Sequence, residues 1–127
     1  MGLADDIGDL LTTNNLSSTV MVGELLPDPN TAVAVVASAG QPTVRTMGGA
    51  MLEQVRVQVR SRATDYLVAE AAMLSAHAIL DGAQGKVLNF RNYQFIEAVQ
   101  PPFYLGLDGN LRFVFVCNYT CYRSAST

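Results

Sequence analysis

The segment Met51–Arg60 has the strictest pattern in this chain of 127 residues, because apolar and polar side chains alternate along it. The alternating positions are Gln54, Val55, Arg56, Val57, Gln58, Val59 and Arg60. Successive side chains of a strand point to opposite faces of its sheet. The pattern therefore predicts a strand with one polar face and one valine face, and the valine face needs an apolar cover.

A helical segment follows and can supply this cover. From Thr64 to Leu80 the apolar residues change to helical spacing, which predicts a helix over about 65–81. Thr64 is the expected N-cap, Asp65 suits the first turn, and Gly82 stands where a glycine commonly ends a helix. The expected main apolar face comprises Leu67, Ala71, Leu74 and Ala78, with Tyr66, Met73, Ala76 and Leu80 beside it. We expect the valine face to pack beneath this helix.

The remaining segments predict one short helix and further strands. Apolar residues from Leu3 to Leu11 have the spacing of an amphipathic helix over about 3–14. The expected strands are Thr19–Glu24, Thr31–Ser38 as a central strand, Lys86–Phe90, Tyr93–Gln100 and Leu111–Tyr122, with Asn92 as a turn or bulge and a hairpin turn at 108–110. The segment Ala39–Ala50 holds three glycines and a proline, which predicts a long loop.

These elements indicate an α+β fold. We expect an antiparallel or mixed sheet of about five strands with one principal helix packed on it and a short N-terminal helix, in the order α-β-β-β-α-β-β. The length fits one domain over residues 1–127.

The composition excludes several classes of protein. Half of the residues are hydrophobic and 15% are charged, which is typical of a chain that folds around a core. A net charge of −3 with a single lysine argues against a surface that binds nucleic acid. The chain has no apolar run of about 20 residues, and its first residues are acidic where a signal peptide is basic. We therefore expect a soluble protein made in a cytoplasm, without a membrane partner.

No residue pattern predicts catalysis, a metal site or a cofactor. Phosphate-binding loops and the motifs of nucleophilic hydrolases are missing from the sequence. Cys117 and Cys121 fall ~13 Å apart on one predicted strand, too far for a disulfide or a shared zinc ion, and are expected to be buried thiols. His77 is the single histidine and lies on the flank of the main helix. Asp65, Glu70 and Asp81 have the spacing of helix-surface charges rather than of an acid–base pair.

Arg56 and Arg60 lie on the polar face of the alternating strand, and Arg62 follows them. Two interpretations stay open at this point. The arginines are either the solvated face of a half-exposed sheet or a subunit contact or pore lining. The planar fork of arginine pairs with carboxylates at two positions, which suits an interface.

Several stretches together resemble the tail-terminator ("minor capsid") proteins of long, non-contractile-tailed bacteriophages. They are the short N-terminal helix, the loop Gln41–Ala50, the strand Glu53–Arg60, Asp65-Tyr66 with an alanine-rich helix, and the turn Gln100–Asp108. The resemblance covers residues 3–122. The stretch Asn118–Tyr122 departs from it, since Cys121 and aromatic residues replace a more charged strand.

This resemblance implies a structural role in the virion and no enzymatic activity. Family members close the end of the tail tube as a hexameric ring and present the surface that docks to the head connector. The implied partners are copies of the chain itself, the tail-tube protein and the head connector or stopper, and DNA passes through the ring without specific binding. The implied location is the head–tail junction of the virion, with the host cytoplasm during assembly.

A closed ring needs two different contact surfaces on each copy, because one surface binds a different surface of the next copy. The strongest candidates are the loop Gln41–Met51 and the turn Pro101–Leu107. The residues assigned to the subunit or tube interface are Arg45, Met47, Met51, Arg56, Arg60, Pro101, Phe103, Tyr104 and Leu105. The alternatives are a head-completion or stopper protein, a tail-tube subunit, or a small α+β enzyme or ligand-binding domain with a pocket around His77 or Arg56.

Overall fold

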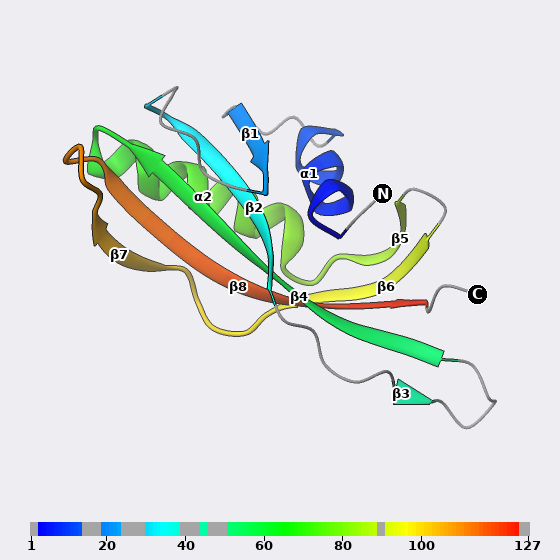
Figure 1. Cartoon of the computed structure of the whole chain (residues 1–127). Coiled ribbons are helices and arrows are strands. Elements are labelled where there is room, and N and C mark those ends of the chain that lie inside the picture. The colour runs from blue at the N-terminus through cyan, green and yellow to red at the C-terminus, as the bar shows by residue number, and fades with distance from the viewer. Residues whose placement is uncertain are drawn as a thin grey trace.

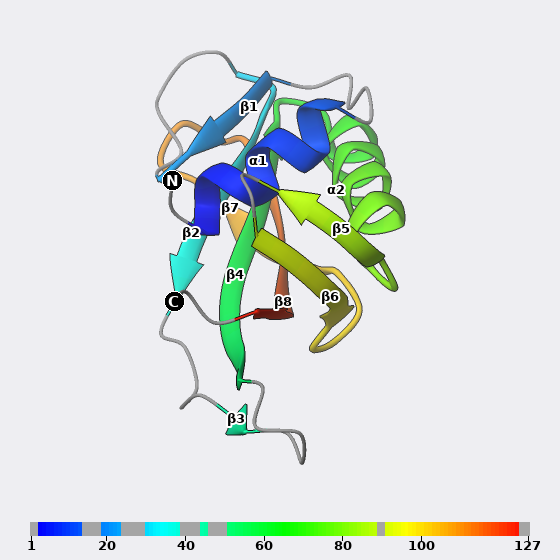
Figure 2. The ribbon, with the colours of Figure 1, turned by 90° about the vertical axis from the view of Figure 1, so that its right-hand side faces the viewer.

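The computed structural model describes residues 3–13, 19–23, 30–38, 44–45, 51–88 and 91–124. Two helices, α1 (Leu3–Thr13) and α2 (Tyr66–Leu80), pack against a curved sheet (Figure 1, Figure 2). The strands are β1 (Thr19–Val22), β2 (Ala32–Ser38), β3 (Val44–Arg45), β4 (Met51–Ala63), β5 (Gln84–Leu88), β6 (Arg91–Ala98), β7 (Phe103–Leu107) and β8 (Phe113–Ser124). The predicted α+β class, with one principal helix and a short N-terminal helix, is confirmed.

The long strands β4 and β8 form the middle of the sheet. Its order is β1-β2-β4-β8-β6-β5, while β3 pairs with β4 and β7 pairs with β8. The β1–β2 pair is parallel, and the other pairs are antiparallel. Strand β2 therefore has a neighbour on each side, as expected of a central strand. The start of β4 and its partner β3 project beyond the helices (Figure 1).

The strand count is the first correction, because the described residues form eight strands rather than about five. Strand β3 lies inside the predicted loop Ala39–Ala50, where the backbone of Val44 and Arg45 pairs with β4. Strand β7, over residues for which no strand was expected, pairs with β8. Asn92 lies within β6 and pairs with Val87, so it is not at a turn, and the irregularity of β6 against β8 lies between Tyr93 and Phe95. Residues 39–43 and 46–50 of the predicted loop lie outside the described residues.

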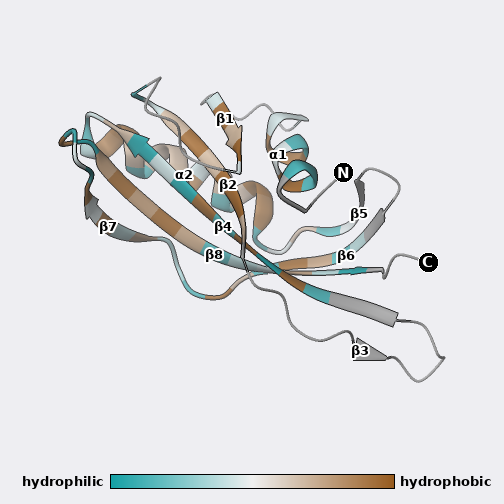
Figure 3. Cartoon of the chain, in the orientation of Figure 1, coloured by the Kyte–Doolittle hydropathy of each residue, from teal (hydrophilic) through white to brown (hydrophobic). Residues whose placement is uncertain are grey.

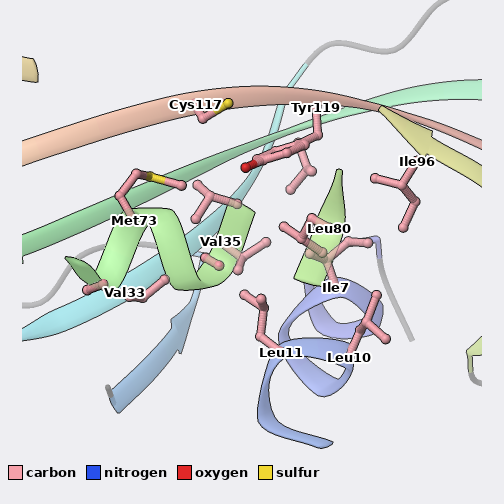
Figure 4. Close-up of a cluster of buried hydrophobic side chains, with 14 of the residues drawn as sticks. Ile7, Leu10, Leu11, Val33, Val35, Met73, Leu80, Ile96, Cys117 and Tyr119 are labelled. Carbon is pink, nitrogen blue, oxygen red and sulfur yellow. The ribbon is translucent and has the colours of Figure 1, made fainter. Parts of the chain in front are cut away.

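The core lies between the sheet and the two helices, where side chains from both helices and several strands meet (Figure 4). Val57 and Val59 of β4 are fully buried there beneath α2, which confirms the predicted valine face. The partners shown in the figure are Ile7, Leu10 and Leu11 of α1, Val33 and Val35 of β2, Met73 and Leu80 of α2, Ile96 of β6, and Cys117 and Tyr119 of β8. Each fully buried aliphatic side chain of this kind contributes about 1.5–3 kcal/mol.

The predicted main apolar face of α2 is wrong, whereas Met73, Ala76 and Leu80, which were expected beside it, are buried. The helix buries Ala69, Ala72, Met73, Ala76 and Leu80. Its predicted main face points to solvent, since Leu67 is 69% exposed and Leu74 is 51% exposed. The mainly small side chains of the buried face let the helix approach the sheet closely, and the Ser61 hydroxyl of β4 donates a hydrogen bond of 2.8 Å to the Ala69 carbonyl oxygen. This helix carries apolar residues on both of its sides, so periodicity alone does not predict which face is buried.

The ends of α2 follow the predicted chemistry with a shift of one residue. Asp65, rather than Thr64, is the N-cap, and its carboxylate accepts a hydrogen bond of 2.9 Å from the Leu67 backbone N–H. Gly82 adopts φ +80°, the left-handed conformation that favours glycine after a helix. Asp65 therefore satisfies one free backbone N–H at the start of the helix, and the Asp81 N–H donates to the His77 carbonyl oxygen at its end.

A buried polar cluster joins α1 to the sheet. The Tyr93 hydroxyl of β6 donates a hydrogen bond to the Asp6 carboxylate, which is 1% exposed. Arg123 of β8 donates to the Tyr93 oxygen at 3.1 Å, and its guanidinium lies 4.0 Å from Asp6. Burial and then the bond to Asp6 raise the pKa of the Tyr93 hydroxyl. The Asp6 carboxylate therefore accepts a hydrogen bond inside the protein. Its position in the first turn of α1 is also favourable because of the helix dipole.

Candidate functional site: an exposed apolar surface beside an arginine pocket

Strand β7 exposes a row of large apolar side chains. Phe103, Tyr104, Leu105 and Leu107 are each between 41% and 53% exposed. Among the described residues β7 pairs with β8 alone, so its second edge has no strand beside it. An apolar strand with an unpaired edge is a ready surface for another chain.

Aromatic contacts connect β7 to the start of α2. The ring of Tyr66 lies edge-on to Tyr104, Phe113 and Phe115, with centroid distances of 5.5, 5.6 and 5.1 Å. Tyr104 also contacts Phe115 at 5.4 Å. The ring of Tyr104 therefore packs against the edge of the core while 41% of the residue remains exposed.

The exposed face of α2 continues this apolar area. Leu67, Val68 and Leu74 are 69%, 46% and 51% exposed, and Tyr66 joins them to β7 through its contact with Tyr104. We call the whole set the β7–α2 surface, which comprises Tyr66, Leu67, Val68, Leu74, Phe103, Tyr104, Leu105 and Leu107. The sequence predicted Phe103, Tyr104 and Leu105 in this role and missed the helix residues. The signal for them was a helix with more apolar residues than one buried face needs.

The other face of the sheet carries the arginines. Teal and brown bands along β4 show its alternation (Figure 3). Arg60 donates to the Gln58 side-chain oxygen at 2.7 Å, and Gln58 donates to the Asn118 side-chain oxygen at 3.1 Å. The Nε atom of Arg56 is buried, and no group of the described residues accepts a hydrogen bond from it. This face is therefore polar and cationic, as the alternation predicts, although Arg56 lies inside it rather than in open solvent.

A pocket of about 440 Å³ lies between β4, β7 and the start of β8. We call it the arginine pocket; its lining comprises Arg60, Arg62, Leu105, Gly106, Leu107, Asp108, Asn110, Arg112 and Val114. Arg62 and Arg112 are 2% and 5% exposed, whereas Arg60 is half-buried. Neither Arg62 nor Arg112 was among the predicted site residues. Their cationic groups meet here because β4 and β8 pair, with Arg62 opposite Val114.

Asp108 holds the turn that closes this pocket. Its carboxylate accepts from the backbone N–H groups of Asn110 and Arg112 at 2.9 Å each and from Arg112 Nε at 2.8 Å. The backbone bond from Arg112 is the main cause that lowers the pKa of Asp108. Arg62 Nε donates to the Asn30 carbonyl at 3.2 Å, and Arg112 Nη1 donates to the Asn30 side-chain oxygen at 3.3 Å. With three arginines and one aspartate, the pocket keeps a net positive charge.

The predicted interface residues divide between the two ends of the sheet. Arg45 and Met51 pair with each other at the β3–β4 end, near the C-terminal end of β8. Phe103, Tyr104 and Leu105 lie at the opposite end of β8, where Phe103 is opposite Val116. Arg60 reaches the pocket beside Leu105, whereas Arg56 lies nearer the middle of β4. Pro101 is exposed just before β7, and Met47 lies outside the described residues.

The remaining candidates for chemistry are internal contacts. His77 Nδ1 lies 2.9 Å from the Tyr119 hydroxyl, and Nε2 lies 3.6 Å from the Asp81 carboxylate. Both cysteines are buried and free, as predicted, and burial raises the pKa of both thiols, to about 12 for Cys121. The described residues hold no group of three or more acidic, cysteine or histidine side chains suited to a metal ion. The arginine pocket contains neither His77 nor Arg56.

No helix in the described part of the chain is long and apolar enough to cross a membrane. No curated protein matches the chain. A chain in a solved structure titled "Virion of native gene transfer agent (GTA) particle" has a similar fold, with a TM-score of 0.64 over 97% of this chain and 95% of that chain at 12% identity. The family described as bacteriophage tail terminator protein matches residues 2–123. The chain therefore belongs to the bacteriophage tail terminator family, whose members are structural proteins of the phage tail.

Proposed function

We propose that this chain closes the end of a phage tail tube as a ring of six copies and presents the surface that joins the tail to the head. The observation that carries the proposal is the β7–α2 surface on a member of this family. Eight large apolar side chains of β7 and α2, each more than a third exposed, make up this surface, and the contact between Tyr66 and Tyr104 joins its two parts. Soluble monomers rarely leave a large apolar patch in water, so such a patch marks a surface for a protein partner.

A closed ring needs a contact in which one patch meets a different patch on the next copy. We assign the β7–α2 surface, with Pro101 and Arg60 at its margin, to contacts between copies. We assign the projecting β3–β4 end, with Arg45 and Met51, to the tail tube or the head connector, and we propose the same contact for Met47 from its place between them in the sequence. The distance between these two ends along β8 supports this division, because one copy can then engage its neighbours and a second ring at the same time.

The proposed partners are further copies of the chain, the tail-tube protein and the head connector. The role is structural rather than enzymatic, at the head–tail junction of the virion, after assembly in the host cytoplasm. DNA passes through the ring without specific binding. The net charge of −3 per copy supports this last point, since the ring as a whole is acidic and repels phosphate.

Binding of the purified protein to purified tail tubes tests the proposal by electron microscopy. We expect extra density at one end of each tube and none along its side. Tubes capped in this way should no longer elongate when tail-tube protein is added. Protein incorporated along the tube would instead identify a tube subunit, and tubes without end density would contradict the terminator role.

A further inference from the structure

The charges of this chain are separated between its two layers. The helices and the caps of α2 carry six acidic residues and no lysine or arginine. Asp6 is buried beside Arg123, and the other five are Asp5, Asp9, Asp65, Glu70 and Asp81. The opposite face of the sheet carries arginines, of which Arg60, Arg62 and Arg112 line one pocket. One copy therefore offers a negative face and a positive face, and these two faces of neighbouring copies are electrostatically complementary.

Glu70 is the acidic residue within α2, and it lies on the outward face of the helix. Leu67 and Leu74 stand three residues before it and four after it, so all three side chains share one face. Both leucines are more than half exposed, and Glu70 is half-buried. This face therefore presents one carboxylate between two apolar side chains.

The arginine pocket has the converse arrangement. Arg60 is its half-buried cation, while the buried Arg62 and Arg112 add positive charge behind it. Leu105 and Leu107 of β7 form apolar walls beside the arginines. A volume of about 440 Å³ is sufficient for a glutamate side chain with an apolar neighbour.

We propose that Glu70 of one copy enters the arginine pocket of the next copy, pairs with Arg60, and brings Leu67 and Leu74 against Leu105 and Leu107. This contact rests on the proposed ring and names its copy-to-copy interface. Charge complementarity favours a second copy as the occupant, because the chain itself displays the carboxylate and the flanking leucines that the pocket fits. Glu70 and the pocket that would receive it lie on different layers of one chain. The contact is therefore heterologous and repeats around a ring. The arginine fork can bind the carboxylate through two hydrogen bonds.

Charge reversal tests this pairing directly. The variants are Glu70→Arg, Arg60→Glu and the double variant, with Gln94→Arg as a control at an exposed position of β6. Sedimentation equilibrium measures assembly of the free protein and of the protein with purified tail tubes. We expect each single reversal to weaken assembly by roughly tenfold or more, the double variant to restore most of it, and Gln94→Arg to assemble normally. Urea unfolding of each variant checks that the fold is retained.

The outcomes separate this contact from the proposed function. Rings that form normally in both single variants would overturn the contact and leave the terminator ring intact. Loss of assembly in the single variants without recovery in the double variant would overturn the pairing of these two residues. A wild-type chain that never assembles, with or without tubes, would overturn the proposed ring and this contact together.

Discussion

Met73 and Leu74 are neighbours in α2 with opposite environments, and truncating each to alanine separates the core from the surface. Met73 is fully buried, so Met73→Ala removes core contacts and leaves a cavity. Such substitutions cost roughly 2–5 kcal/mol of unfolding free energy. Leu74 is 51% exposed, so Leu74→Ala loses about half the burial of a leucine, which amounts to about 1 kcal/mol.

Urea unfolding followed by circular dichroism measures both values. All proteins are compared at one low concentration, where subunits are dissociated, because assembly would add to the apparent stability. Sedimentation at higher concentration should then show normal assembly by folded Met73→Ala protein and weakened assembly by Leu74→Ala. Equal losses of stability in the two variants would refute the orientation of α2 and place the predicted stripe of Leu67 and Leu74 in the core.

Three further predictions concern the core and its polar contacts. Val57→Asp should abolish cooperative unfolding, because it buries an unpaired carboxylate, whereas Gln58→Asp on the polar face of the same strand should fold; a soluble, cooperative Val57→Asp protein would reverse the faces of β4. Tyr93→Phe should lower the unfolding free energy by about 1–3 kcal/mol, since a buried carboxylate of α1 loses a donor, and an unchanged urea midpoint would contradict this role. At pH 8 neither thiol of β8 should react with a thiol reagent until urea unfolds the chain, because burial raises both pKa values; a native thiol that reacts rapidly would contradict their burial.

The strand β4 is the element that the sequence predicts best, and the reason is geometric. Its period of two assigns every side chain to one face, so the buried Val57 and Val59 follow directly from the alternation. The buried thiols of β8 follow from the same reasoning. The central position of β2 follows from its continuous small apolar run.

The sequence does not predict which side of α2 is buried, because both sides of the helix carry apolar residues. The choice depends on how closely the alanine side approaches the sheet, and on the hydrogen bond from Ser61 to the Ala69 carbonyl. Strand β7 is also difficult to predict from the sequence, because Gly106 and the preceding prolines interrupt the pattern of a strand. Its pairing with β8 stabilises it in the fold. The arginine pocket forms only when the sheet is assembled, because the pairing of β4 with β8 brings Arg62 beside Arg112, which lies fifty positions later in the chain.

The mass of the protein in solution, with and without purified tail tubes, tests the central claim most directly. The claim is that this tail terminator acts as a closed ring of six copies. Native mass spectrometry and sedimentation should therefore find a species with six times the 13.6 kDa mass of one chain, either free or released from tube ends. A chain that stays monomeric or dimeric in the presence of tubes, or that forms an open series of lengths, would contradict a closed terminator ring.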